Sequence, residues 1–403
     1  MTRSLVWLAT AWIGMLHAAP DSGMITSEIG PLTLTSEVEW AVRTPLINKS
    51  MEHFIEAKEI AGAVTLVADG EKILHLSAVG FSDLEKKAPM SPDSVFWIAS
   101  MTKPVTATAV MMMVEEGKIA VDDPVAQYLP EFRYLKDAAG NDIVITIKQC
   151  LTHSSGLSDL TPNESKGITT LKDLTPLVAA KPVQFPPGSK WQYCQTGINT
   201  AARIVEVVSG KLFPEFVQER LFDPLGMTDT SFYPGEEQVA RLAMSYKRTE
   251  AGELEKAEIP FLNGRSPSDK GRYPMANGGL FSTAGDYSKF ARMILRGGEL
   301  DGKRYLKADS VKQMTDVQSG DLVTGFTPGS AWGLGWSIVR EPQGVSAALS
   351  PGSFGHGGMF GTQVWIDPLK MRIYLLLIQR SNLPNSDASD IRRDFQNAAA
   401  KQP

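Results

Sequence analysis

The sequence is poor in the residues that build metal sites and disulfide frameworks. Of its 403 residues, two are cysteines and five are histidines. They are scattered and form no H-E-x-x-H motif, so no zinc site is predicted, and no metal or organic cofactor is implied. Cys150 and Cys194 could pair in an exported chain if their Cα atoms lie close and well aimed, whereas two buried free thiols are the alternative.

The chain also lacks an excess of positive charge. Its 40 lysines and arginines are outnumbered by 45 aspartates and glutamates, which gives a formal net charge of -5. A mildly acidic surface repels phosphates and no long basic run interrupts it, so we expect no nucleic-acid partner. The glycine-rich motifs of nucleotide-binding proteins are absent. The G-x-S-x-G motif is absent too, which excludes an α/β-hydrolase.

Long apolar runs are rare, and the informative one lies at the N-terminus. Arg3 precedes an apolar stretch at 5–16, and small residues follow at 18–20. This pattern is typical of a secretory signal. We therefore expect residues 1–19 to be a signal peptide and the mature protein to be exported, periplasmic or extracellular; a buried N-terminal helix is the alternative. No later run is long enough to span a membrane.

Strand patterns occupy both ends of the chain. Residues 61–68 and 72–79 are β-rich, and Asp69-Gly70 between them is a hairpin turn signal. This opening is antiparallel rather than a βαβ unit. The last third returns to short β-rich segments, at 332–339, 362–366 and 372–379.

Helical patterns fill the middle of the chain. Residues 105–114 are apolar or small on nearly every face, which predicts a helix that is buried all round and ends at Gly117. A second helix fits residues 285–296. The polar C-terminal tail is either a closing amphipathic helix or partly disordered.

This order of elements predicts an α+β fold (an α/β sandwich). Its antiparallel sheet is flanked by helices and built from both chain ends, with an inserted, mainly helical domain. We expect a sheet domain made of residues 20–99 and 270–403. The helical domain is expected at residues 100–269, with the active site at the interface between the two.

Ser100 and Lys103 form the single S-x-x-K motif of the chain. Positions i and i+3 of a helix are neighbours, so the lysine amine can approach the serine hydroxyl. A serine needs an adjacent base to attack a carbonyl, and a lysine can be that base where burial lowers its pKa. The simpler alternative is a serine that caps a helix beside a solvated lysine.

Pro104 indicates where this helix begins, because proline is tolerated only in the first turn. Ser100 then lies near the N-cap. The unpaired backbone N–H groups and the positive dipole end of the helix favour an oxyanion beside Ser100.

Tyr193 lies in a loop that leads from a Pro-Pro-Gly turn into a helix. Such loops often carry catalytic side chains. A tyrosine can shuttle a proton if a nearby ammonium group stabilises its phenolate. A tyrosine packed at a domain edge is the alternative.

His356 lies in a glycine-rich segment, with further glycines at 355, 357, 358 and 361. Without side chains, the start of a strand lets a ligand backbone lie along its edge, so His356, Gly357 and Gly358 are candidate substrate-binding residues. The N–H group of Met359 would be a second oxyanion donor. A glycine-rich bulge with an incidental histidine is the alternative.

Together these segments resemble the serine β-lactamase and penicillin-binding protein superfamily. The similarity is greatest to class C β-lactamases, their DD-peptidase relatives and the family VIII carboxylesterases. That pattern is S-x-x-K, then Y-x-N, then K-T-G or H-x-G. The matching residues are Ser100 to Lys103, Tyr193-Cys194-Gln195 and His356-Gly357-Gly358. Supporting stretches lie at 151–157, 221–232 and 277–290, and the resemblance covers roughly residues 40–380.

The resemblance implies an acyl-enzyme mechanism. Ser100 is the nucleophile, Lys103 and Tyr193 share the proton transfers, and the N–H groups of Ser100 and Met359 hold the oxyanion. Which of Lys103 and Tyr193 is the general base stays open, because coupled groups titrate as a unit. Gln195 would contact the substrate in place of the family's asparagine.

Two departures from the family pattern bear on the substrate. Gln195 is one methylene longer than asparagine, and His356 replaces the lysine whose permanent charge meets a substrate carboxylate in β-lactamases. Both changes weaken lactam hydrolysis more than ester hydrolysis. We therefore expect a secreted carboxylesterase. The alternatives are a β-lactamase, a DD-peptidase or D-amino-acid amidase, or a penicillin-binding sensor without turnover. Each takes a small ester, lactam or peptide, and the oligomeric state stays open.

Overall fold

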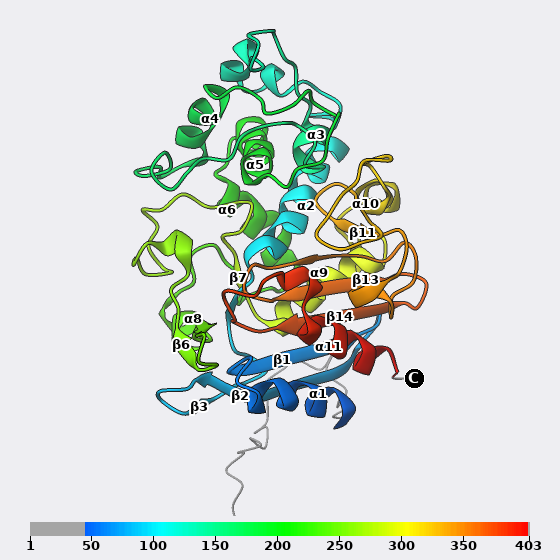
Figure 1. The fold of residues 1–403 in the computed structure, drawn as a ribbon. Helices are drawn as coiled ribbons and strands as arrows, with labels where there is room; N and C mark the ends of the chain where they lie inside the picture. Colours follow the sequence, from blue (N-terminus) through cyan, green and yellow to red (C-terminus); the bar gives the residue numbers. More distant parts are fainter. Residues whose placement is uncertain (1–44, 402–403) are drawn as a thin grey trace, which may run out of the picture.

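The computed structural model describes residues 45–401 (Figure 1). The expected signal peptide at 1–19 lies outside the described residues. Within the described part of the chain, no helix combines the length and the apolar character needed to cross a membrane.

An eight-stranded antiparallel sheet forms the lower half of the molecule in the view of Figure 1. Its strand order is β10-β11-β12-β13-β14-β1-β2-β3. Strand β1 pairs with β14, so the sheet joins the two ends of the chain. The strands are β1 (Gly62–Ala68), β2 (Ile73–Asp83), β3 (Ala88–Pro89), β10 (Ser330–Trp332), β11 (Ser337–Val339), β12 (Phe354–Gly357), β13 (Gln363–Asp367) and β14 (Arg372–Leu377).

The central strands are buried on both faces. In β14, Leu375 and Leu377 face the larger core, while Tyr374 and Leu376 face a second cluster on the opposite side of the sheet. Side chains alternate between the faces of a strand, so a strand covered on both sides is apolar throughout. This explains why the segment RIYLLL shows no polar alternation.

Helices cover both faces of the sheet. Helix α1 (Pro45–Glu56) and helix α11 (Asp390–Ala400) pack together on one face, through Met51 and Phe395 among others. Helix α9 (Ala284–Leu295) packs against β1 and β14 on the other face. An antiparallel sheet flanked by helices confirms the predicted fold class.

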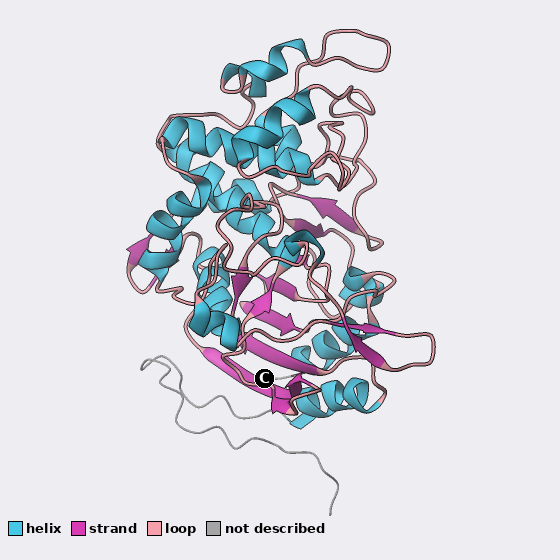
Figure 2. Ribbon diagram, turned by 90° about the vertical axis from the view of Figure 1, so that its left-hand side faces the viewer, coloured by secondary structure: helices cyan, strands magenta, loops and turns pink. Residues whose placement is uncertain are grey.

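The remaining helices lie mostly above the sheet (Figures 1 and 2). Helix α2 (Thr102–Glu115) is buried from Thr102 to Met113 and packs against α5 (Gln195–Ser209). The other helices are α3 (Ile147–Leu151), α4 (Leu171–Ala179), α6 (Phe213–Val217), α7 (Asp223–Leu225), α8 (Glu236–Ala240) and α10 (Ala308–Thr315). Short two-stranded pairs join β4 (Phe96–Trp97) to β7 (Phe281–Ser282), β5 (Tyr246–Arg248) to β6 (Leu254–Lys256), and β8 (Glu299–Leu300) to β9 (Lys303–Arg304).

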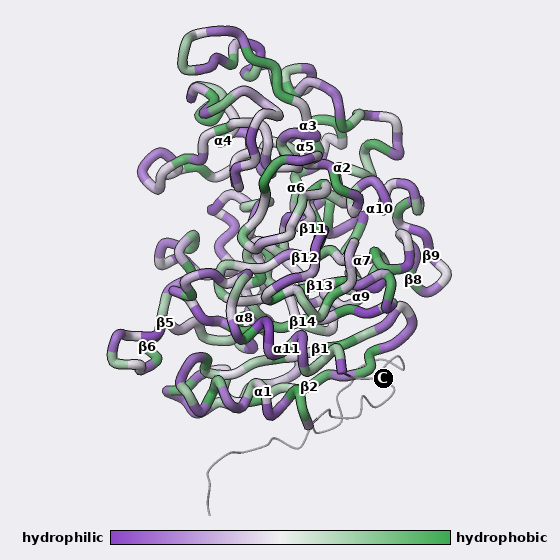
Figure 3. Tube along the Cα trace, turned by 45° about the vertical axis from the view of Figure 1, so that its right-hand side comes forward, coloured by the Kyte–Doolittle hydropathy of each residue, from purple (hydrophilic) through white to green (hydrophobic). Residues whose placement is uncertain are grey.

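Burial follows the hydropathy of the chain. Figure 3 shows hydrophobic stretches along the inner strands and α2, and hydrophilic stretches in many of the outer loops. The apolar pattern at 105–114 thus correctly predicted a helix that is buried all round. The polar tail forms α11, which is the amphipathic alternative.

The structure corrects the expected strand at 332–339 and resolves the state of the two cysteines. The segment 332–339 is not one strand but the turn and arms of a hairpin, because Gly335 adopts a φ of +73° between β10 and β11. Cys150 and Cys194 are both free and buried, so they form no disulfide.

Candidate active site

Ser100 lies in a tight turn directly before α2. A 3₁₀ turn at Ala99–Met101 runs into the helix, so the helix begins two residues after Ser100, close to where Pro104 predicted. Ala99 adopts a φ of +45°, an unfavourable backbone conformation for a residue with a side chain. The turn is held from outside: the N–H of Ile98 donates to the carbonyl of Leu280 at 3.1 Å.

Lys103 contacts Ser100 from the first turn of the helix. Its Nζ donates to Ser100 Oγ at 2.8 Å and to the carbonyl oxygen of Asn277 at 2.8 Å. The side chain is fully buried, and this burial lowers the pKa of Lys103 to about 7, while the nearby Asp159 carboxylate acts in the opposite direction. A substantial fraction of the amine is therefore neutral near neutral pH and able to accept a proton.

Tyr193 completes the group from the other side of Lys103. The Nζ of Lys103 lies 4.6 Å from the centroid of the Tyr193 ring. Burial raises the pKa of Tyr193 well above its usual value, and the Ser100 hydroxyl beside it acts in the opposite direction. The phenol therefore keeps its proton near neutral pH, which suits a proton donor, and the neutral lysine is the base that is available there.

Aromatic side chains surround Tyr193. Ring centroids lie 4.9 Å away for Phe326, 5.9 Å for Trp332 and 6.2 Å for Trp191. Large aromatic rings supply apolar contact area with little conformational freedom. Trp332 is buried, whereas Phe326 is 42% exposed and offers an apolar surface beside the reactive groups.

Asn277 connects three parts of the site, and the sequence analysis assigned it no role. Its carbonyl oxygen accepts the hydrogen bond from Lys103, and its Nδ2 donates to Gln195 Oε1 at 2.8 Å. Its Oδ1 accepts from Asn199 Nδ2 at 2.8 Å. The amide oxygen of Gln195, expected to contact the substrate, is therefore engaged by Asn277. The family-like stretch at 277–290 is the sequence signal that contains Asn277.

His153 is a second residue that sequence reasoning missed. Its ring centroid lies 4.5 Å from that of Tyr193, and its Nδ1 accepts a hydrogen bond from the N–H of Cys194 at 3.1 Å. Burial holds the pKa of His153 well below its usual value, so the ring stays neutral and able to accept. It therefore fixes the loop that carries Tyr193.

Asp159 fixes the start of the next helix. One carboxylate oxygen accepts from the N–H groups of Gln195 at 2.8 Å and Thr196 at 2.9 Å. A carboxylate there complements the positive end of α5. The loop between Tyr193 and the helix is thus held by His153 and Asp159 together.

The two predicted oxyanion donors are available. Among the described residues, neither the N–H of Ser100 nor that of Met359 donates a hydrogen bond. Gly358 packs tightly on the Ser100 turn, since a Cβ there would lie 2.7 Å from the carbonyl oxygen of Ile98. The glycine therefore allows the end of β12 to approach the turn. The side chain of Met359 is 59% exposed.

His356 lies on β12 with its side chain buried. Its Nδ1 donates to the carbonyl of Gly357 at 2.7 Å, and its ring packs edge-on against Trp332 at 5.6 Å between centroids. Burial lowers the pKa of His356 to about 3. The histidine is therefore neutral at working pH and supplies no cation for a substrate carboxylate.

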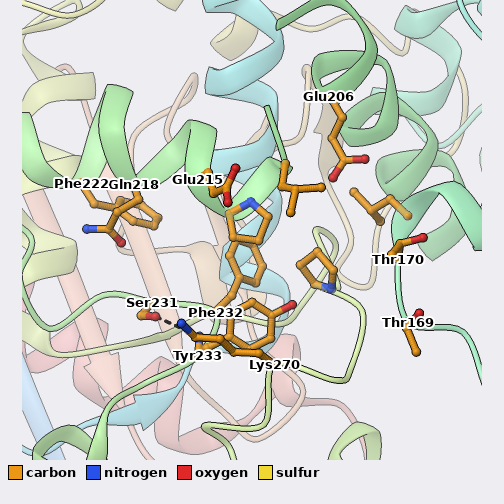
Figure 4. Close-up of a pocket in the computed structure, with 14 residues that line it drawn as sticks. Thr169, Thr170, Glu206, Glu215, Gln218, Phe222, Ser231, Phe232, Tyr233 and Lys270 are labelled. Atoms are coloured by element: carbon orange, nitrogen blue, oxygen red, sulfur yellow. Dashed lines mark hydrogen bonds between the residues drawn. The ribbon is translucent and has the colours of Figure 1, made fainter. Parts of the chain in front are cut away.

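A separate cavity of about 390 Å³ lies between the helices, and Figure 4 shows its lining. None of the predicted site residues lines it; its walls include Glu206, Glu215, Phe232 and Tyr233. The Oγ of Ser231, also in the lining, accepts from the N–H of Tyr233 at 2.9 Å. Among the described residues, Ser231 has no lysine partner, so this cavity lacks the serine–lysine pair found at Ser100.

The comparisons with known proteins agree with this geometry. The Beta-lactamase family model matches residues 47–399. Esterase EstB of Burkholderia gladioli is 29% identical over 78% of this chain and 84% of its own length. Penicillin-binding protein 4 of Amycolatopsis lactamdurans is 33% identical over 75% of this chain and 75% of its own length.

A solved structure extends the agreement to the fold. EstCE1, described as a hydrolase with promiscuous acyltransferase activity, superposes with a TM-score of 0.77 and 25% identity. The match covers 88% of this chain and 97% of the other. The chain belongs to the β-lactamase family and is a β-lactamase-like serine hydrolase.

Proposed function

We propose that the protein is a carboxylesterase that cleaves small esters through an acyl-enzyme on Ser100. The observation that carries the proposal is the 2.8 Å contact between Ser100 Oγ and the buried Nζ of Lys103. A serine hydroxyl bonded to a lysine with a pKa of about 7 is a nucleophile beside its base.

The proposed reaction has two halves. In acylation, Ser100 Oγ bonds to the ester carbonyl carbon while its proton passes to Lys103, and the N–H groups of Ser100 and Met359 hold the oxyanion. The bond to the alcohol oxygen then breaks, and Tyr193 relays a proton to that oxygen. In deacylation, water attacks the acyl carbon and gives a proton to Lys103 or Tyr193. The bond from the acyl carbon to Ser100 Oγ then breaks, a proton returns to Oγ, and the carboxylic acid leaves.

The choice of ester over lactam or peptide rests on the charge of the site. Lactams and cell-wall peptides carry a carboxylate, which the lysine of β-lactamases meets with a permanent charge, whereas His356 is neutral with a pKa of about 3. The exposed Phe326 ring beside Tyr193 suits uncharged groups instead. The similarity to esterase EstB supports an esterase, and EstCE1 is described as a hydrolase with acyltransferase activity, whereas penicillin-binding protein 4 represents the alternative.

Intact-mass spectrometry after brief mixing tests the proposal. A short-chain activated ester should add a transient acyl mass to the wild-type protein and none to Ser100→Ala. Ser165→Ala, at a half-buried loop serine outside the site, is a matched control and should label normally. A lasting adduct with penicillin would favour a DD-peptidase or a sensor, and an ester adduct that persists in Ser100→Ala would refute the nucleophile.

We also propose that the enzyme is exported, on the strength of the apolar stretch at 5–16 after Arg3. Expression of the full chain in a bacterial host tests this. The mature protein should be recovered outside the cytoplasm with its N-terminal segment removed. An intact N-terminus on protein retained in the cytoplasm would contradict export.

A further inference from the structure

A carboxylate from the C-terminal segment lies directly against strand β12. Asp387 belongs to a short 3₁₀ turn at Ser386–Ala388, just before α11. A Cβ on Gly357 would lie 1.9 Å from Asp387 Oδ1, which is far shorter than any non-bonded contact of a Cβ atom. The carboxylate therefore fills the space that a side chain at Gly357 would take, next to His356.

The position of Asp387 is fixed by its neighbours. Its N–H donates to Asn385 Oδ1 at 3.0 Å, and Gln363 Nε2 lies 3.4 Å from its Oδ1. Arg392 Nη1 donates to the backbone carbonyl of Asp387, while the Arg392 guanidinium lies over the Trp365 ring at 3.9 Å. The buried arginine thus holds the backbone of this turn, and the carboxylate points toward β12.

Burial raises the pKa of Asp387, whereas Arg392, Gln363 and Lys103 favour its ionised form. The charge of the ionised carboxylate reaches the reactive groups. It acts on both Lys103 and Tyr193, in each case raising the pKa, as does Asp159 from the helical side. His356, whose ring lies beside Tyr193, is neutral. A substrate carboxylate here would therefore meet the carboxylates of Asp387 and Asp159 as well as the partly protonated Lys103. The nearby Arg392 guanidinium is already engaged by the Asp387 carbonyl and the Trp365 ring.

The departing alcohol is the part of the substrate that meets Asp387. In the proposed reaction Tyr193 gives a proton to the alcohol oxygen, so the alcohol leaves beside the Tyr193 ring. The centroid of that ring lies 6.2 Å from the centroid of His356, whose neighbour Gly357 contacts Asp387. A group that extends from the alcohol along β12 would therefore approach the carboxylate.

We propose that Asp387 determines substrate specificity by excluding esters whose alcohol part carries a carboxylate. This inference rests on the proposed esterase function and refines it: the substrates are esters of uncharged alcohols or phenols. Like charges held a few ångströms apart in a partly buried site disfavour binding by roughly tenfold or more.

A matched pair of phenyl esters tests this role. 3-(Butyryloxy)benzoate and 3-(butyryloxy)benzamide have nearly the same shape and differ in one negative charge. We expect wild-type kcat/KM to favour the benzamide by at least about tenfold. Asp387→Asn, which keeps the shape and an acceptor for Gln363, should reduce this preference by about tenfold, mainly by raising kcat/KM for the benzoate.

The control is Asp390→Asn, three residues along the same segment. Asp390 is exposed and pairs with Arg393 at 2.6 Å, so its loss should leave the preference unchanged. Should Asp387→Asn fail to fold, as judged by circular dichroism, Asp387→Ser supplies the same comparison. An unchanged preference in the folded variant would overturn the role of Asp387.

The two proposals fail in distinguishable ways. Hydrolysis of both esters at equal rates by the wild-type protein would overturn the role of Asp387 and leave the esterase function standing. Hydrolysis of neither ester, above the rate of Ser100→Ala, would overturn the esterase function itself.

Discussion

The two walls of the active site are built on different principles. The helical wall carries Ser100, Lys103, Tyr193 and Asn277, whose polar atoms are close enough to exchange protons or share hydrogen bonds. The wall formed by β12 carries a neutral histidine and two glycines. Bond-making chemistry is thus concentrated on one side, and the other side sets shape and charge.

This division explains where each wall tolerates change. The helical wall depends on a buried amine whose pKa is lowered to about 7, a property that any loss of burial would remove. The β12 wall depends on the absence of side chains, since a Cβ on Gly357 or Gly358 would overlap neighbouring atoms. Substitutions on the helical wall should therefore mainly lower kcat, and those on the β12 wall should mainly alter substrate binding and selection.

The largest expected effect comes from Lys103→Ala on the helical wall. Removing the base that contacts Ser100 should lower kcat for a neutral ester on the order of a thousandfold. Pre-steady-state kinetics would measure the acylation rate. Lys118→Ala, at an exposed lysine just beyond α2, is the matched control. Near-normal activity of Lys103→Ala would place the base elsewhere and break the comparison.

The same residue sets the expected pH dependence of the wild-type enzyme. Lysine accepts a proton only when it is neutral, and the pKa of Lys103 is about 7. Activity should therefore rise as the pH increases through about 7 and level off above it. A rate that falls over this pH range would assign the pH dependence to a group that acts in its protonated form.

A smaller effect is expected from Gly357→Ala on the β12 wall. The added Cβ would lie 1.9 Å from Asp387 Oδ1 and 2.5 Å from Gln363 Nε2. Forcing these groups apart should cost about 1–3 kcal/mol of unfolding free energy and raise KM more than it lowers kcat. Thermal unfolding and steady-state kinetics would measure both. Gly285→Ala, where the Cβ would meet only Thr283 Oγ1 at 4.0 Å, should change neither.

Next comes Asn277→Ala, which tests whether the helical wall acts as one network. The change leaves the buried Asn199 and the half-buried Gln195 without their shared partner. Unpaired buried amides cost about 1–3 kcal/mol, and we expect about a tenfold loss of kcat/KM as well. The backbone carbonyl that accepts from Lys103 is retained, so activity should still rise with pH near 7. Loss of this rise would mean that the side chain of Asn277, rather than its backbone, positions the lysine.

Much of this architecture could be predicted from local patterns. The spacing of Ser100 and Lys103 and the position of Pro104 predicted the serine–lysine contact, because helix geometry alone brings these residues together. The segments at 61–68 and 372–379 were identified as strands from their β-rich composition. The segment 332–339 was interpreted wrongly, since its apolar composition hid a turn that depends on the positive φ of Gly335.

The supporting residues could not be predicted for a physical reason. Asn277 meets Lys103 across 174 positions of sequence, and it does so through a backbone carbonyl, which leaves no trace in the residue type. His153 accepts from Cys194 across 41 positions. Asp387 lies in a polar tail whose structure the sequence left open. Such contacts arise only when the sheet and the helices pack together.

The smallest expected effect, from His356→Asn, sharpens the contrast between the walls. An asparagine amide can replace Nδ1 as the donor to the Gly357 carbonyl, a bond of 2.7 Å, and it stays uncharged, as His356 does with its pKa of about 3. Activity on a neutral ester should therefore fall by less than about threefold. The pH profile measured between pH 6 and 9 should keep its rise near 7, because that rise belongs to Lys103. A profile that loses the rise would give the histidine a share in proton transfer, and the β12 wall would then take part in the chemistry as well as in selection.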